Sequence, residues 1–143
     1  MKLREIMTAP VIRIEPQESV SVAARTLAHY NIGALPVCGS DGRLCGLITD
    51  RDIVTRCLAA GRNPGSTQVR EIMTGRVIAA KPDSDAVLAA QMMGRQQIRR
   101  LPVVENERIC GMVSIGDLAK CNEIAYNAGD ALAQISNGIS SRN

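Results

Sequence analysis

The segment GLITDRDI, residues 46–53, decides the fold, because it returns 65 residues later as GMVSIGDL, residues 111–118. Each copy runs from a short apolar stretch into a hydroxyl residue, with an aspartate three positions further on. This spacing is that of a capping box at a helix start, with aspartate replacing the usual glutamate or glutamine. We therefore expect each copy to form a strand that ends at the hydroxyl residue, followed directly by a helix.

The sequence around this segment is also written twice. LREIMTAPVIRIEP, residues 3–16, returns as VREIMTGRVIAAKP, residues 69–82, and IGALPV, residues 32–37, returns as IRRLPV, residues 98–103. Both pairs are offset by 66 residues, so the second copy lacks one residue in a turn. Self-similarity at a fixed period indicates one structural unit that is repeated.

Each copy has the pattern of a β-α-β-β-α unit. Apolar residues at helical spacing predict an amphipathic helix after the first strand. The second helix is expected to begin near Asp50 in one copy and near Ile115 in the other. The expected strands cover residues 11–14, 35–38 and 45–49 in the first copy, and residues 77–80, 101–104 and 109–114 in the second.

The predicted fold class is α/β (α+β), with two pseudo-symmetric repeats packed face to face and a C-terminal helix. The repeats are expected at residues 1–65 and 66–121, in one integrated module, because neither copy alone buries much surface. Residues 59–67 contain the glycine, asparagine and proline of a loop. Residues 122–143 form the helical extension, where Gly129 could break the helix and the last residues are expected to fray.

The composition restricts the class of protein. The chain has 143 residues, 45% of them hydrophobic, without phenylalanine or tryptophan, so small aliphatic side chains must fill the core. The net charge of +3 is a mild excess and argues against a dedicated nucleic-acid binder. A membrane-spanning stretch and a signal-peptide pattern are missing from the sequence, which predicts a cytoplasmic location and no membrane partner.

The five cysteines are odd in number and form no CxxC motif, and His29 is the only histidine. This pattern argues against a disulfide framework and against a metal site, and predicts small buried apolar cysteines. A redox pair of Cys38 and Cys45, on either side of a hairpin turn, is the alternative, and a thiol or metal catalyst is the enzyme hypothesis. His29 is expected at the surface, and Met92 and Met93 in the core or a dimer contact.

The two hydroxyl–aspartate pairs allow two interpretations. Thr49 with Asp52, and Ser114 with Asp117, would be complete as helix caps, each stabilising its helix by about 1 kcal/mol. A helix N-terminus also suits phosphate, and an adjacent carboxylate can accept hydrogen bonds from a ribose diol. The pairs are therefore either caps alone or part of a nucleoside phosphate site.

These motifs together resemble a tandem pair of CBS domains, known as a Bateman module, of the stand-alone bacterial type. The resemblance rests on REIMT in both copies, on IGALPV with IRRLPV, and on GLITDRDI with GMVSIGDL, and it covers roughly residues 1–120. It implies a regulatory module that is not an enzyme and that binds an adenine nucleotide (AMP, ADP or ATP) or a related adenosyl compound. It also implies dimerisation through helices.

The resemblance assigns a role to individual residues of this sequence. Asp117 would bind ribose, as would Asp52 in the symmetric site, and the hydroxyls of Ser114 and Thr49 would approach phosphate or ribose. Residues of the opposite repeat would hold the base: Thr8 and Val11 for the Asp117 site, Thr74 and Val77 for the Asp52 site. The remaining residues that would line the two clefts are Ile32, Gly33, Ile98, Arg99 and Arg100.

The two sites are expected to differ. Arg100 stands where the family commonly places a phosphate-binding cation, whereas its counterpart in the first copy is Ala34, so the Asp117 site should bind the better-charged phosphate. In the other site, Arg51 or Arg56 could partly substitute. The expected partners are the nucleotide, a second copy of the chain and an unidentified protein, with no obligatory cofactor. The alternative function is a ligand-free dimeric scaffold.

Overall fold

The computed structural model describes residues 1–121 and 124–138, which group into two compact units. Unit 2 consists of Ile12–Val77 and Glu107–Ile109. Unit 1 consists of Met1–Val11, Ile78–Asn106 and the described residues from Cys110 onward. Each unit combines helices with a small two-stranded sheet, so the predicted mixture of helix and strand is confirmed.

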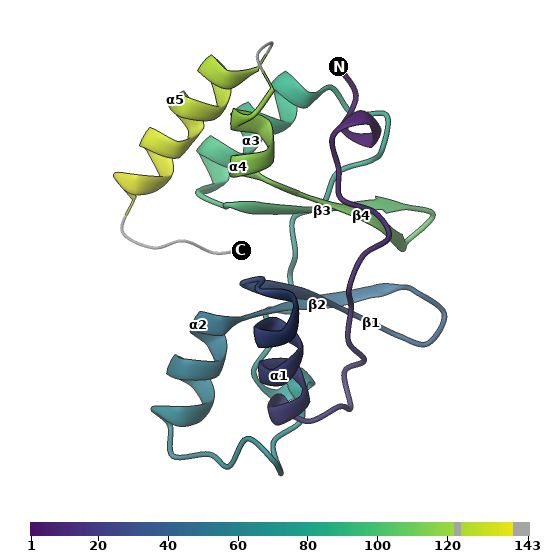
Figure 1. Ribbon diagram of the computed structural model, residues 1–143, viewed down its shortest axis with the longest axis vertical. Coiled ribbons are helices and arrows are strands. Elements are labelled where there is room, and N and C mark those ends of the chain that lie inside the picture. The colour runs from purple at the N-terminus through teal and green to yellow at the C-terminus, as the bar shows by residue number, and fades with distance from the viewer. Residues whose placement is uncertain (122–123, 139–143) are drawn as a thin grey trace. The chain divides into compact units, whose positions relative to one another are not determined.

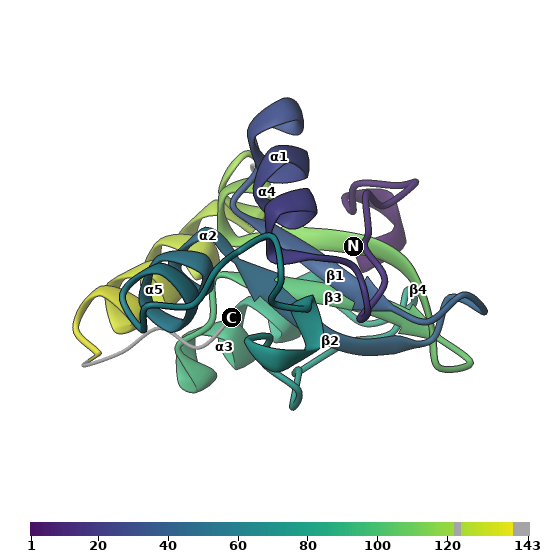
Figure 2. The ribbon, with the colours of Figure 1, turned by 90° about the horizontal axis from the view of Figure 1, so that it is seen from below.

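In unit 2, the strands β1 and β2 lie side by side (Figure 2). They run antiparallel, with Ala34 opposite Thr49. The second helix begins at the end of β2 and continues without a break as a π-helical segment, η2. The elements of unit 2 are α1 (Val20–Tyr30), β1 (Ala34–Cys38), β2 (Leu44–Thr49), α2 (Asp50–Asp52), η2 (Ile53–Leu58) and η3 (Val69–Glu71).

Unit 1 repeats this order of elements and adds the C-terminal helix α5, drawn in yellow beside α3 and α4 in Figure 1. The strands β3 and β4 form its sheet. Its elements are η1 (Leu3–Glu5), α3 (Ala86–Gln96), β3 (Arg100–Glu105), β4 (Arg108–Ser114), α4 (Ile115–Ala119) and α5 (Ala125–Ser136). The predicted C-terminal helix is confirmed, and it runs through Gly129 without the expected break.

The helices α1 and α3 begin and end in the same way. The side chain of Ser19 accepts a hydrogen bond from the Val22 amide at 3.2 Å, and that of Asp85 accepts one from the Leu88 amide at 3.1 Å. Both helices end at a residue with a left-handed backbone, Asn31 in α1 and Gln97 in α3. Such side-chain caps and left-handed ends satisfy backbone groups that a helix leaves unpaired.

The first predicted strand of each copy is much shorter than expected. Ile14 pairs with Val37, and Ala80 with Val103, each through a single parallel bridge. The predictions of strands at residues 11–14 and 77–80 are therefore wrong in length. Proline lacks an amide for a longer ladder, and Pro16 or Pro82 follows each bridge by two residues.

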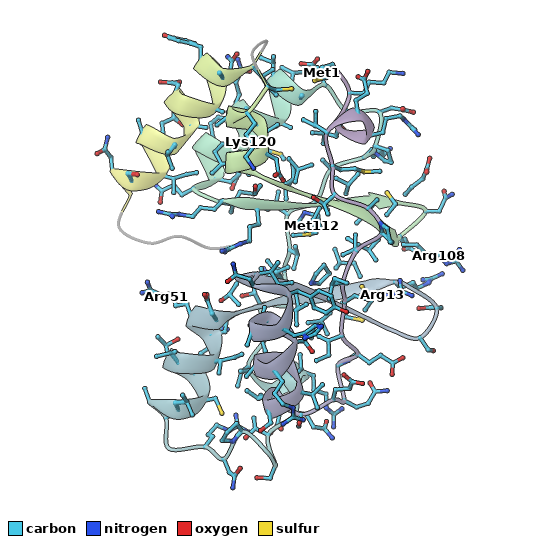
Figure 3. The ribbon with its side chains drawn as sticks, viewed as in Figure 1. Met1, Arg13, Arg51, Arg108, Met112 and Lys120 are labelled. Atoms are coloured by element: carbon cyan, nitrogen blue, oxygen red, sulfur yellow. The ribbon has the colours of Figure 1, made fainter. Side chains whose placement is uncertain are left out.

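The REIMT motif of each copy packs in the unit that holds the other copy's hairpin. The amide of Thr8 donates to the carbonyl of Met112 in unit 1 at 2.8 Å, and Met112 is labelled on β4 in Figure 3. In unit 2, the amide of Thr74 donates to the carbonyl of Leu47 at 2.9 Å. The boundaries of the compact units therefore differ from those of the sequence repeats, because each unit includes the REIMT segment of the other copy. The division into repeats at residues 1–65 and 66–121 stays a prediction.

Each unit has its own hydrophobic core. The core of unit 2 joins α1, β1, β2 and η2 to Val69 and Ile72, and that of unit 1 joins α3, β3, β4, α4 and α5 to Leu3. Met93 is fully buried and Met92 packs against the same core, as predicted. The predicted fraying of the last residues concerns residues 139–143, which lie outside the described part. None of the described helices is both long and apolar enough to cross a bilayer.

Candidate functional site

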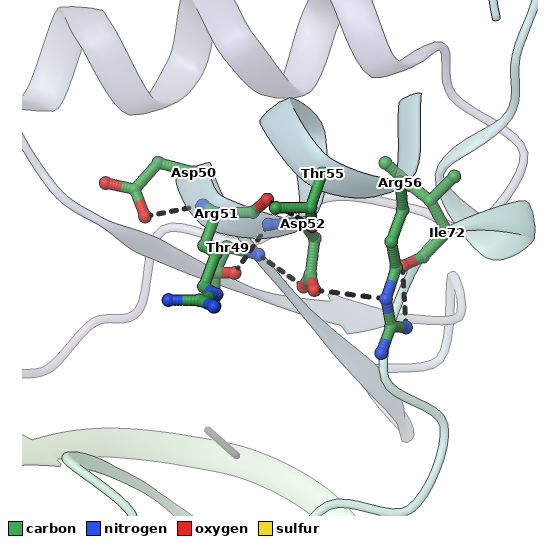
Figure 4. Close-up of polar contacts among 7 residues, drawn as sticks. All are labelled: Thr49, Asp50, Arg51, Asp52, Thr55, Arg56 and Ile72. Carbon is green, nitrogen blue, oxygen red and sulfur yellow. Dashed lines mark hydrogen bonds and ion pairs between the residues drawn. The ribbon is translucent and has the colours of Figure 1, made fainter. Parts of the chain in front are cut away.

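Thr49 and Asp52 form a reciprocal capping box at the end of β2 (Figure 4). The Asp52 amide donates to Thr49 Oγ1 at 3.1 Å, and the Thr49 amide donates to Asp52 Oδ2 at 3.0 Å. Both residues are buried, with Asp52 only 8% exposed. The predicted cap is confirmed, and it uses one of the two carboxylate oxygens.

Ser114 and Asp117 form the same box in unit 1. The Asp117 amide donates to Ser114 Oγ at 3.0 Å, and the Ser114 amide donates to Asp117 Oδ2 at 2.9 Å. Both residues are half-buried. The other carboxylate oxygen, Asp117 Oδ1, has no hydrogen bond or ion pair to any part of residues 1–121 and 124–138.

The first amides of both helices are largely engaged by protein groups, which limits the phosphate binding that a helix N-terminus was expected to offer. The Asp50 amide donates to the Gly33 carbonyl at 3.0 Å, and the Ile115 amide donates to the Arg99 carbonyl at 2.9 Å. In unit 2, Asp50 Oδ1 also accepts from the Arg51 amide at 2.8 Å. An isoleucine at position 115 cannot do the same for the next amide in unit 1, because its side chain is apolar.

These bonds bring the predicted residues before each LP dipeptide to the helix starts. Because the Arg99 carbonyl bonds the first residue of α4, Arg99 and Arg100 lie at the beginning of the Asp117 helix. The Arg99 side chain is exposed and that of Arg100 is half-buried. The backbone of this segment thus lies at the helix start, and a phosphate-binding role of the two guanidinium groups stays a prediction.

In unit 2, the cation nearest to the carboxylate is Arg56. Its Nε lies 3.7 Å from Asp52 Oδ1, and its Nη1 donates to the Ile72 carbonyl at 3.3 Å (Figure 4). Arg51 is exposed at the start of α2, where Figure 3 labels it. Both arginines were candidates for binding phosphate in this unit, but Arg56 is already paired with protein groups.

The other predicted residues divide between the two units. Thr8 and Val11 lie in unit 1 with Ser114 and Asp117, whereas Thr74 and Val77 lie in unit 2 with Thr49 and Asp52. Each candidate site thus draws its residues from a single compact unit.

The apolar residues before the LP dipeptides differ in exposure. Ile32 is 37% exposed, whereas its counterpart Ile98 is fully buried in the core of unit 1. The Ile98 side chain therefore packs in the core, and only its backbone can border the candidate site.

Two contacts at the start of α2 were not predicted from the sequence. Asp50 caps its own following amide, and Arg56 pairs with Asp52 one helical turn away. The signal for the second contact was present, because aspartate and arginine at positions i and i+4 of a helix commonly pair.

The cysteines do not form a reactive cluster. Cys38 and Cys57 are buried, as predicted, whereas Cys110 and Cys121 are only half-buried. Cys45 is exposed, because its position on β2 faces solvent. Burial raises the pKa of the Cys38 thiol to about 11, so this group stays protonated at neutral pH. His29 is exposed, as expected. In the described part of the chain, no group of three or more histidine, cysteine, aspartate or glutamate residues could hold a metal.

Comparison with known proteins identifies this arrangement. The family model of the CBS domain matches residues 3–59 and 69–122. The chain is 38% identical over 134 residues to the CBS domain-containing protein YhcV of Bacillus subtilis, covering 94% of each chain. It is 36% identical over 117 residues to Hypoxic response protein 1 of Mycobacterium tuberculosis, covering 82% of each chain.

Solved structures agree with the sequence relatives. The structure of Hypoxic Response Protein I with two coordinated zinc ions has a TM-score of 0.78 at 35% identity, covering 84% of this chain and 98% of the other. The CBS domain pair of protein MJ0100, in complex with 5-methylthioadenosine and S-adenosyl-L-methionine, has a TM-score of 0.76 at 31% identity, covering 84% and 94%. The doubled capping boxes and the matches to both repeats lead to one conclusion: the chain belongs to the CBS domain family and carries two copies of the domain.

Proposed function

We propose that the chain is a regulatory module without catalytic activity that binds an adenosine-containing ligand at Asp117 in unit 1. The ligand would be AMP, ADP, ATP or a related adenosyl compound. Asp117 accepts hydrogen bonds from the ribose diol, and the hydroxyl of Ser114 lies beside the sugar or its phosphate. Binding would then be passed on to a partner protein or to a second copy of the chain.

The observation that carries this proposal is the state of the Asp117 carboxylate. One oxygen is fixed by the Ser114 amide, so the side chain is held in position without ligand. The second oxygen has no partner within the described residues. A preorganised acceptor of this kind loses little side-chain entropy on binding.

Charge supports a phosphate next to this carboxylate. Arg99 and Arg100 flank the helix start in unit 1, and arginine can bind phosphate through two parallel hydrogen bonds. At the corresponding place in unit 2, Gly33 and Ala34 have no charge, and Asp50 adds a negative one. Unit 1 is therefore the better site for an anionic ligand.

The solved relatives support the class of ligand. The CBS domain pair of MJ0100 is seen in complex with two adenosyl compounds, 5-methylthioadenosine and S-adenosyl-L-methionine. Those compounds share an adenosine group with AMP and ATP, and a site built around a ribose acceptor accepts any of them. The number of phosphates then depends on Arg99 and Arg100.

Thermal unfolding with adenosine compounds tests the proposal. A ligand present at 100 times its Kd should stabilise the fold by about 2.7 kcal/mol. The Asp117→Asn variant should lose this response, because asparagine can keep the cap through its amide oxygen but has no charge. Asp130→Asn, on the exposed face of α5, is the matched control and should respond as the native chain does. An unchanged response of Asp117→Asn, or no response of the native chain at millimolar ligand, would refute the proposal.

A ligand-free dimeric scaffold is the second candidate. It is favoured by the capping boxes, which explain why both hydroxyl–aspartate pairs occur without any ligand. It is also favoured by the exposed apolar side chains of Val54 and Leu58, which are 56% and 54% exposed on η2. Sedimentation that shows a dimer, combined with the absence of any adenosine response, would select this candidate.

A further inference from the structure

We propose that Arg56 closes the unit 2 site by acting as an internal occupant of the Asp52 carboxylate, so that the chain binds a single nucleoside ligand. This inference rests on the proposed function, because it assumes that Asp117 is the ribose acceptor in unit 1. In this inference Arg56 does not bind the phosphate of a ligand. It competes with the ribose of the ligand for the Asp52 carboxylate.

The contacts around Asp52 differ from those around Asp117, because a cation lies within ion-pair distance of the second carboxylate oxygen of Asp52. Oδ2 accepts from the Thr49 amide, and Oδ1 faces Arg56 Nε at 3.7 Å. The Asp52 side chain is only 12% exposed, whereas that of Arg56 is 53% exposed. A nearly buried carboxylate is therefore compensated by a cation that lies over it from the solvent side.

Arg56 is held in this position at a second point. Its Nη1 donates to the Ile72 carbonyl at 3.3 Å, which ties the guanidinium to the segment that follows η3 (Figure 4). The helix also continues through η2, which places residue 56 one turn beyond Asp52 on the same face. Two contacts and the helix position together fix the side chain over the carboxylate.

Replacing this arginine by a ribose is unfavourable for electrostatic reasons. A ribose diol offers neutral hydroxyl donors, whereas Arg56 offers a full positive charge to a carboxylate that is largely removed from water. Displacing Arg56 removes the compensating cation from a carboxylate that is only 12% exposed, and the exposure of the arginine keeps this cost modest. A nucleoside must meet this cost in unit 2, but it meets no such cost in unit 1.

Unit 1 differs at the corresponding sequence position. The counterpart of Arg56, at the offset of 65 residues, is Cys121, which carries no cation. The helix α4 ends at Ala119, whereas the helix that begins with α2 continues through η2 to Leu58. These two differences separate the surroundings of Asp117 from those of Asp52 within the described residues.

Isothermal titration calorimetry of the full chain with 5′-methylthioadenosine and with AMP tests the inference. Because 5′-methylthioadenosine has no phosphate, its binding depends on the ribose acceptor and not on any attraction between Arg56 and a phosphate group. The native chain should bind about one ligand, and Arg56→Met should bind about two, because methionine keeps the apolar stem and removes the charge. Arg51→Met is the matched control and should bind about one, since the Arg51 guanidinium makes no ion pair within the described residues.

Two double variants assign the second site. Asp52→Asn added to Arg56→Met should return the stoichiometry to about one, and Asp117→Asn added to Arg56→Met should leave only the new site. Two sites in the native chain, or a single site in Arg56→Met, would overturn the inference while the proposed function stands. If no protein of the set binds either probe, the proposed function fails, and the inference fails with it.

Discussion

Gly46 and Gly111 occupy equivalent positions in the two copies, and the REIMT motif explains why both are glycine. A Cβ atom at Gly46 would lie 2.6 Å from the Thr74 carbonyl oxygen and 2.7 Å from Met73 Sδ. The three atoms nearest to a Cβ at Gly111 would be side-chain atoms of Met7, namely its Sδ, Cγ and Cβ. Each glycine therefore lets the motif approach the strand closely enough to hydrogen bond with it.

The two glycines should differ in their tolerance of alanine. Gly111→Ala should destabilise the fold by about 1 kcal/mol, because the Met7 side chain can change rotamer, whereas Gly46→Ala should cost about 3 kcal/mol, because a backbone carbonyl cannot move aside. Urea denaturation measures both. Gly75→Ala is the control, since nothing lies within 4 Å of its Cβ position. Equal effects at Gly46 and Gly111 would show that the approach of the motif does not limit these positions.

At the scale of elements, the helix α5 distinguishes the two copies. In unit 1, α5 packs against α3 and α4 and buries Ala128, Ala131 and Ile135. The corresponding face of α1 and η2 in unit 2 instead has an open groove of about 340 Å³, lined by residues such as Leu27, Ala28 and Val54. Within residues 1–121 and 124–138, the same fold thus has a helix face covered by α5 in one unit and an open groove on that face in the other.

Replacing two glycines by alanine should change the stability of the α5 region in opposite directions. A Cβ at Gly94 would lie 3.0 Å from Ala131 Cα and 3.2 Å from its Cβ, so Gly94→Ala should destabilise the protein by about 1–2 kcal/mol despite the better helix propensity of alanine. Gly129, within α5, has nothing within 4 Å, so Gly129→Ala should stabilise the protein by about 0.5–1 kcal/mol. Urea unfolding of both variants checks the pair, and a stabilising Gly94→Ala would contradict the close packing of α3 and α5.

At the scale of the whole molecule, each unit has an exposed carboxyl group whose pKa is lower in the folded state than its ordinary value. In unit 2, the Gln68 amide, followed by Arg62, lowers the pKa of Glu71 below its ordinary value of 4.5. In unit 1, hydrogen bonding to Arg4 lowers the pKa of Asp83 below 3.8. Carboxyl groups with a lowered folded-state pKa contribute stability above their unfolded-state pKa and lose it as the pH falls through the folded-state value.

The free energy of unfolding should therefore be constant from neutral pH down to about pH 5 and should decrease below it. The contribution of the ion pairs should be small and should weaken in salt, because all of these groups are exposed. Urea titrations at a series of pH values test this expectation. In the double variant Glu71→Gln/Asp83→Asn, the free energy of unfolding should decrease less steeply below about pH 5. A pH profile identical to that of the native chain would mean that other groups cause the decrease.

Much of the fold could be predicted from the sequence because the information is local. The helices α1 and α3 occur where an amphipathic helix was expected in each copy, and the hairpin strands lie within a few residues of their predicted bounds, since apolar periodicity and turn residues encode them. The capping boxes could also be predicted, because hydroxyl and aspartate lie three residues apart in the chain. The pairs Thr49–Asp52 and Ser114–Asp117 are therefore the part of the candidate site that the sequence indicates most directly.

The sequence by itself determined the repeat, its elements and the two helix starts, because each depends on residues that are neighbours along the chain. Tertiary structure alone decided which segments complete each unit and how each carboxylate is partnered. Thr8 pairs with Met112, far away in the sequence, and Arg56 reaches the Ile72 carbonyl. Contacts of this kind depend on the folded path of the whole chain, which local periodicity does not encode.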